Sequence, residues 1–321
     1  MTSSGFRLAF LPNPPLPLPR VSGPKLAPLT PTARADIDFV QFLGRGNDVE
    51  SQVWKAKING AGFFVLKMFY FRYSDYYVRN YTRDLALPLA DLQLYIDYFK
   101  PFNYECRVYG RLKEEKREEL AVKALGYLLL TPHQEAHLAW KVTGESSDLP
   151  SADIGELDGD NFWGRYEQHC SLPVRAIVKE LVSPKLPTSD EVQGMWADLQ
   201  ALHSLGIFVG DTYGGNYLGG KLVDFSRVWT MYHPALIQTY GNRWEEWILE
   251  ELQKLQDNCY NVINSLPSEN IDSFEDLDAF GVGHIADYIS KILPSAYNWL
   301  KWEKDADAAH AFVEQSLFKR A

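Results

Sequence analysis

Three side chains that could carry out phosphoryl transfer lie close together in the sequence: Asp211, Asn216 and Asp224. A carboxylate can orient an attacking hydroxyl, and a second carboxylate with an amide oxygen can hold Mg²⁺ on phosphate groups. Asp224 follows a short apolar run that is typical of a strand. An amphipathic helix predicted at 189–205, with Gly206 at its end, leads into this group.

The spacing of the group is similar to that of a known catalytic segment. Asn216 is five positions after Asp211, as in the catalytic loop of protein kinases. The run NYLGGKLVDFSR, which begins at Asn216, resembles a fungal family of kinase-like proteins associated with a kinetochore subunit of the Sim complex. The resemblance covers residues 37–230. It implies ATP and Mg²⁺ as cofactors, Asp211 as the catalytic carboxylate, and Asn216 and Asp224 as Mg²⁺ ligands. The alternative is a glycine-rich turn with helix-capping acids.

An ion pair is expected between Lys67 and Glu105. Lys67 lies in an apolar strand pattern, at the place where the kinase pattern has the lysine of the α- and β-phosphates. Glu105 shares a helical stripe with Tyr109 and Leu112, and burying a carboxylate without a partner is costly. The alternatives are a solvated strand lysine and a glutamate at an edge position open to solvent.

The nucleotide-binding positions implied by the resemblance are less regular. Gly44 and Gly46 resemble the first two glycines of the phosphate-covering loop, although a simple hairpin turn is the alternative. Glu180 and Val182 would present backbone groups to the adenine edge from the hinge. Lys179 would then stand at the back of the pocket, where apolar residues are usual, so either its amine reaches solvent or the register is displaced by one.

The fold class predicted from these patterns is α+β: a two-lobed, protein-kinase-like fold with an antiparallel-sheet N-lobe at 37–182 and a mainly helical C-lobe at 183–321. The N-lobe is expected to begin with three strands, of which the last two are joined by the hairpin signal Asn59-Gly60. The predicted strands are 39–43, 52–58, 63–69, 125–130 and 176–182. The predicted helices are 104–120, 189–205 with Ser189 as N-cap, 243–266 and two shorter ones beyond.

Residues 1–36 are expected to form a disordered, proline-rich arm outside the fold. Eight of the eighteen prolines fall within residues 12–31. Such a composition favours an extended chain, and a proline-rich ligand for a protein partner is the alternative.

Composition excludes several classes of protein. The net charge of −10 argues against a nucleic-acid surface. No apolar run approaches the length of a membrane span, which is about 18 residues or more. The three cysteines, Cys106, Cys170 and Cys259, are odd in number and widely spaced, which fits a reducing compartment. We therefore expect an intracellular protein of the cytoplasm or nucleus.

One further pattern is interpreted as incidental. His133 and His137 have the i, i+4 spacing of zinc ligands, but they follow Pro132 near a predicted strand end. We expect a polar loop there.

Two functions follow from the sequence. The first is an ATP- and Mg²⁺-dependent kinase-like phosphotransferase that acts on a protein or small-molecule acceptor. The second is a pseudokinase or scaffold, in which a kinase fold serves as a protein-binding module of a kinetochore-type assembly. Val209 and Gly210 favour the second, because they replace the usual His-Arg pair of the catalytic loop.

Overall fold

The computed structural model describes residues 26–29, 36–44, 50–71, 98–144, 163–165, 172–185, 187–230, 250, 251, 253 and 254. The chain divides into two compact units. The first unit comprises Pro24–Gly110 and Lys123–Leu181, and the second comprises Met1–Gly23, Arg111–Val122 and Val182–Ala321. Gly46, most of the helix predicted at 243–266 and the two shorter helices predicted beyond it lie outside the described residues.

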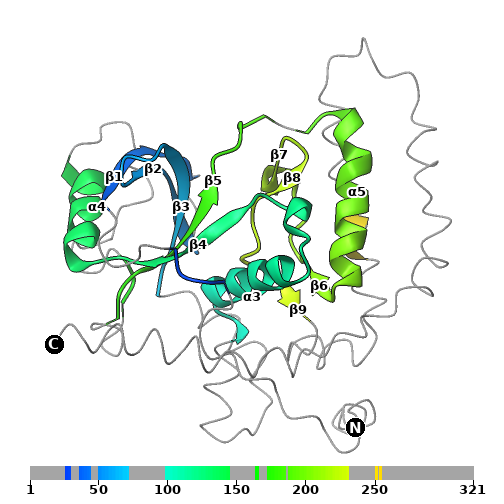
Figure 1. Ribbon diagram of the computed structural model, residues 1–321, viewed down its shortest axis with the longest axis horizontal. Coiled ribbons are helices and arrows are strands. Elements are labelled where there is room, and N and C mark those ends of the chain that lie inside the picture. The colour runs from blue at the N-terminus through cyan, green and yellow to red at the C-terminus, as the bar shows by residue number, and fades with distance from the viewer. Residues whose placement is uncertain are drawn as a thin grey trace, which may run out of the picture. The chain divides into compact units, whose positions relative to one another are not determined.

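One antiparallel sheet of five strands organises the first unit, with the order β1-β2-β3-β5-β4 (Figure 1). Its strands are β1 (Ile37–Phe42), β2 (Ser51–Ile58), β3 (Phe63–Phe69), β4 (Ala124–Leu129) and β5 (Arg175–Glu180). Asn59 and Gly60 form the turn between β2 and β3 with φ of 53° and 69°, and Ala61 N donates to Ile58 O at 3.0 Å. This left-handed pair is the hairpin turn that the Asn-Gly sequence predicts.

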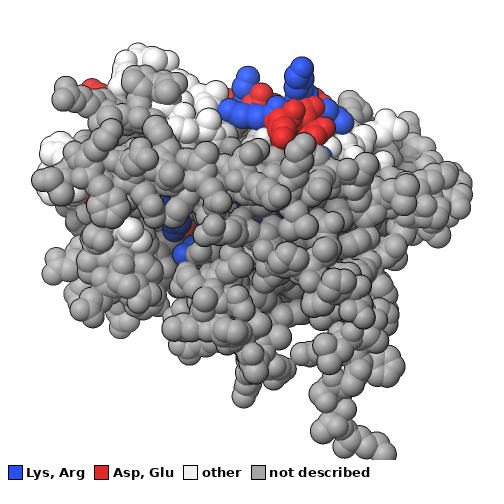
Figure 2. Space-filling view, turned by 60° about the horizontal axis from the view of Figure 1, so that its bottom comes forward, with Lys and Arg blue, Asp and Glu red and all other residues white. Residues whose placement is uncertain are grey.

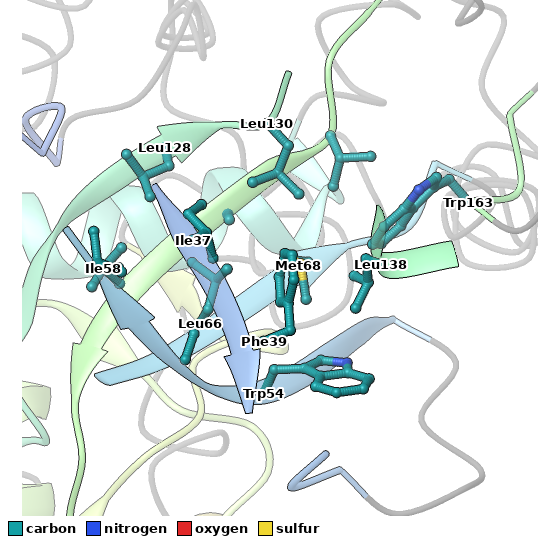
Figure 3. Packing of buried hydrophobic residues seen from close by; sticks show 14 of the residues in the cluster. Ile37, Phe39, Trp54, Ile58, Leu66, Met68, Leu128, Leu130, Leu138 and Trp163 are labelled. Carbon is teal, nitrogen blue, oxygen red and sulfur yellow. The ribbon is translucent and has the colours of Figure 1, made fainter. Parts of the chain in front are cut away.

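One face of this sheet is covered by an apolar core. Because side chains alternate along a strand, Leu66 and Met68 of β3 and Ala176 and Val178 of β5 point to the same side. Helix α4 (Pro132–Gly144) adds Leu138 to this cluster. Figure 3 shows Leu66, Met68 and Leu138 in one cluster with the aromatic residues Phe39 and Trp54 of the neighbouring strands. The labelled members are Ile37, Phe39, Trp54, Ile58, Leu66, Met68, Leu128, Leu130, Leu138 and Trp163.

The other face of the sheet packs against helix α3 (Pro101–Glu114). Phe102 of α3 lies 5.5 Å from Phe69 of β3 and 6.1 Å from Tyr127 of β4, between ring centroids, in edge-to-face contacts. Lys67 lies between Leu66 and Met68 in the sequence, so it points to this face and away from the apolar core. The sheet therefore separates the core from the charged groups of the site.

The prediction of one helix over 104–120 is wrong at its C-terminal end. Arg117 N donates to Leu112 O at 2.8 Å and Lys116 N to Lys113 O at 3.1 Å, while Lys116 has φ of 55°. These bonds form a Schellman cap, which ends a helix without requiring glycine. A separate 3-10 helix, η3 (Glu118–Leu120), follows.

The expectation that residues 1–36 lie outside the fold needs correction for residues 26–29. Leu29 N donates to Tyr127 O at 2.9 Å and Tyr127 N to Ala27 O at 3.1 Å, which forms a parallel bridge at the edge of β4. Leu26 is fully buried. The segment thus covers hydrogen-bonding groups that an edge strand would otherwise leave open.

The second unit contains helix α5 (Ser189–Ser204) and several short strands. Strand β6 (Ile207–Phe208) pairs with β9 (Trp229–Thr230), and β7 (Tyr217–Leu218) pairs with β8 (Lys221–Leu222). The N-cap of α5 is Thr188 and not Ser189, because Thr188 forms a capping box with Glu191. Gly206 follows the helix with φ of 73°, as predicted for its end.

Charged side chains of both signs lie together on the face in Figure 2. Opposite charges are paired where α3 ends, since Lys113 Nζ is 3.9 Å from Glu118 Oε1 and Arg117 Nε is 2.5 Å from Glu119 Oε1. None of the described helices is long and apolar enough to cross a membrane.

Candidate functional site

The predicted ion pair between Lys67 and Glu105 is present, and a second lysine joins it. Lys67 Nζ contacts Oε1 of Glu105, and Lys179 Nζ lies 2.7 Å from Oε2 of the same carboxylate. The three side chains are at most 4% exposed. A buried carboxylate requires compensation, and here each oxygen has its own ammonium group.

The sheet register explains why both lysines reach one carboxylate. Lys67 of β3 pairs with Ile177 of β5, and Lys179 is two residues further along β5. Residues two apart on a strand share a face, so the two lysines are diagonal neighbours on the side that α3 covers. Glu105 is in the second turn of α3 and meets both. The expectation that the Lys179 amine reaches solvent is wrong, because this amine points inward to Glu105.

Cys106, next to Glu105 on α3, lies in the same buried environment. Burial is the main cause that raises the pKa of its thiol well above the usual range, and the Glu105 carboxylate adds to this effect. A thiol that stays protonated is a poor nucleophile and a poor metal ligand. Cys106 is therefore a packing residue of the site.

Asp211 and Asn216 are joined by a side-chain hydrogen bond. Asn216 Nδ2 donates to the backbone O of Asp211 at 3.1 Å, which spans the loop between them. Residues 214–216 form a 3-10 turn, η6 (Gly214–Asn216), and both side chains are half-buried. Because the amide nitrogen is engaged with the loop, the amide oxygen of Asn216 points away from that bond.

Asp224 is brought next to Asn216 by the β7–β8 hairpin. Gly219 and Gly220 turn the chain with φ of 54° and 73°, and Val223 N donates to Asn216 O at 2.8 Å beyond the paired residues. Val223 is therefore opposite Asn216, and Asp224 is the next residue after Val223. Its Oδ1 accepts a hydrogen bond from Ser226 N at 2.7 Å, a local turn that fixes the carboxylate.

Two residues that hold the backbone before Asp211 in place, His203 and Glu251, were not predicted. Glu251 Oε2 accepts from Val209 N at 2.9 Å and lies 2.8 Å from His203 Nε2, while Oε1 accepts from Gly210 N at 3.0 Å. Both side chains are fully buried. The carboxylate thus fixes the backbone immediately before Asp211. Nothing in the sequence indicates this pairing, because Glu251 lies in a stretch rich in acidic residues.

Gly210 adopts φ of 71° in this position. An L side chain is strained in that region, which glycine enters freely. The local backbone thus gives a physical reason for glycine in place of the arginine that is usual in the kinase pattern.

The other positions predicted to bind nucleotide are described one by one. Glu180 is exposed, and its Oε1 accepts from Lys123 N at 2.8 Å, while its own N donates to Lys123 O at 3.0 Å. Val182 is half-buried and lies two residues beyond β5. Gly44 lies just after β1. Their nucleotide contacts stay a prediction.

The interpretation of His133 and His137 as loop residues is wrong, because both lie on helix α4. The rings can share a face at this spacing. His137 nevertheless packs edge-to-face on Phe39, with ring centroids 5.9 Å apart. Among the described residues, no group of three His, Cys, Asp or Glu side chains could hold a metal ion.

The antiparallel sheet with its lysine–glutamate pair, together with the Asp211–Asn216 loop and the following Asp224, defines a protein with a kinase-like fold. The predicted α+β class is confirmed. The chain belongs to the kinetochore Sim4 complex subunit FTA2 family, whose model matches residues 14–229.

Solved structures of kinases show limited similarity to the chain. A complex of the Rio2 kinase from Chaetomium thermophilum with ADP/Mg²⁺-phosphoaspartate has 14% identity and a TM-score of 0.38, over 87% of this chain and 73% of that chain. A second structure of the Rio2 kinase from the same organism has 14% identity and a TM-score of 0.37, over 87% and 74%. No similar protein was found among curated sequences.

Proposed function

We propose that this chain is an ATP- and Mg²⁺-dependent phosphotransferase with a protein or small-molecule acceptor. The observation that carries the proposal is the buried pair of Lys67 with Glu105. A lysine held on a strand by a helix carboxylate is the device with which kinases bind the α- and β-phosphates. A solvated strand lysine would have no need of a buried partner.

The donor atoms near Asp211 fit the proposed metal. Mg²⁺ prefers oxygen ligands, and Asn216 and Asp224 offer an amide and a carboxylate from neighbouring positions of one hairpin. Mg²⁺-ATP, when bound, supplies the phosphoryl group. Lys67 would neutralise phosphate charge, Asn216 and Asp224 would hold the metal, and Asp211 would orient the acceptor hydroxyl and take its proton.

A second function, as a scaffold, is favoured by two observations. The family is named for a subunit of a kinetochore complex, which points to protein partners and a nuclear location. In addition, Trp140 on helix α4 is 56% exposed, and tryptophan is enriched among the residues that anchor protein interfaces. In this case the kinase-like fold would be a protein-binding module, and the proline-rich arm could contribute to docking.

The variant Asp211→Asn separates the two functions. It removes the carboxylate that would act on the acceptor, so turnover should fall by about 10²-fold or more while nucleotide affinity stays nearly unchanged. The phosphotransferase proposal requires that this variant, expressed and folded, fails to rescue a strain that lacks the protein. Full rescue would support the scaffold.

A further inference from the structure

The position of Lys179 raises the question of what a second lysine does at Glu105. Besides its ion pair with Glu105, Lys179 makes a cation–π contact, with Nζ 5.2 Å from the centroid of the Tyr109 ring. Tyr109 is one helical turn after Glu105, so both of these contacts of Lys179 are with α3. A cation between a carboxylate and an aromatic face is held from two sides. Lys67, in contrast, has its aromatic contact within its own strand, 5.3 Å from the Phe69 ring.

We propose that Lys179 is a positioning residue that holds α3 against the sheet through Glu105 and Tyr109, independently of Lys67. In a site with one lysine, the same ammonium must bind both the helix carboxylate and a ligand. Here Oε2 of Glu105 has a partner of its own. Lys67 could therefore engage a phosphate, as the proposed function requires, without releasing the helix.

The rigid placement of Lys179 supports this role. It is the next-to-last residue of β5, paired with Val65 of β3 on one side and Ala124 of β4 on the other. Its side chain is 3% exposed. A lysine whose strand is paired on both sides loses its conformational freedom when the sheet forms and not when a ligand binds, so its ion pair with Glu105 is part of the folded state.

Hydrogen exchange of the α3 amides tests the proposal without any nucleotide. Lys179→Met should raise exchange at residues 105–109 by roughly 10- to 100-fold, the factor expected for loss of one close contact with a charged group. Exchange in β2 and β3 should not change. Lys67→Met should leave α3 protection nearly intact, because Lys179 still holds Glu105. Lys179→Arg should restore protection, and Lys57→Met, at an exposed lysine of β2, is the matched control.

The proposal is overturned if Lys179→Met leaves α3 as protected as in the unchanged chain, or if Lys67→Met alone releases it. Should the methionine variant not fold, Lys179→Gln keeps an N–H donor without the charge and must also raise α3 exchange. A second set of exchange measurements, made with Mg²⁺-ATP, examines the link to the proposed function. In the unchanged chain, which keeps Lys179, protection of the α3 amides should be the same with and without nucleotide. Absence of nucleotide binding would refute the proposed function, but the measurements without nucleotide would still decide whether Lys179 holds α3.

Discussion

His203 Nε2 and Glu251 Oε2 lie 2.8 Å apart, although 48 residues separate them in the sequence. The same carboxylate accepts hydrogen bonds from the backbone of Val209 and Gly210. His203 lies in the last turn of α5, the helix before Asp211, and also stacks on Phe208, with ring centroids 6.0 Å apart. The backbone that carries Asp211 is therefore fixed by a buried carboxyl group contributed from a distant part of the chain.

Loss of this carboxylate should be strongly destabilising. Glu251→Ala leaves His203 and two backbone N–H groups without their buried acceptor, so we expect the free energy of unfolding to fall by about 3–5 kcal/mol. Urea denaturation measures this change. Glu250→Ala is the control, because Glu250 is exposed and its ion pair with Lys254 lies at the surface; its cost should stay below about 0.5 kcal/mol. Equal effects of the two variants would contradict the anchoring role.

The contact between residues 26–29 and β4 should depend on the absence of a side chain at Gly126. A Cβ there would lie 2.7 Å from Leu29 N and 2.8 Å from Leu29 Cα, closer than backbone atoms tolerate. Gly126→Ala should therefore detach the segment, and exchange of the Leu29 and Tyr127 amides should rise. Gly194→Ala in α5 is the matched control, since a Cβ there meets nothing within 4 Å and should slightly stabilise the helix. Unchanged protection of Leu29 in the Gly126 variant would refute this account.

The capping box of α5 predicts a specific pH dependence. The backbone N–H of Thr188 donates to the Glu191 carboxylate at 2.8 Å and lowers the pKa of that group below the ordinary value of 4.5. A depressed pKa adds stability above the unfolded-state pKa, and this contribution is lost as the pH falls through the folded-state pKa. The unfolding free energies of the unchanged chain and of Glu191→Gln should therefore differ near neutral pH and converge in acid below about 4.5. A difference that does not vary with pH would contradict the assignment.

The sequence predicted those parts of the fold that local patterns control. The strand alternation of β2 and β3 and the Asn59-Gly60 turn depend on neighbouring residues, and both appear as expected. The end of α3 was missed because Lys116 adopts the left-handed cap conformation, in which glycine is usual. Propensity alone favours continuing the helix there.

The candidate site was predictable only where a pattern marks it. Lys67 and Glu105 could be paired because each lies in an apolar pattern, where a buried charge needs an opposite one, and because Lys67 matches the kinase pattern. The partnership of Lys179 with Glu105 depends on the register of β3 against β5, which the sequence does not specify. The contact between Glu251 and His203 depends on tertiary packing over 48 residues, for which no local pattern exists.

The central claim is that Lys67 binds nucleotide phosphates and that Asp224 holds Mg²⁺. Calorimetric titration with ATP, with and without Mg²⁺, tests it most directly. The account predicts Mg²⁺-dependent binding, a loss of affinity of about 10-fold or more in Lys67→Met, and loss of the Mg²⁺-dependent part in Asp224→Asn. Lys57→Met should bind as the unchanged chain does. Absence of binding with Mg²⁺ present, or equal affinity in Lys67→Met, would contradict the account.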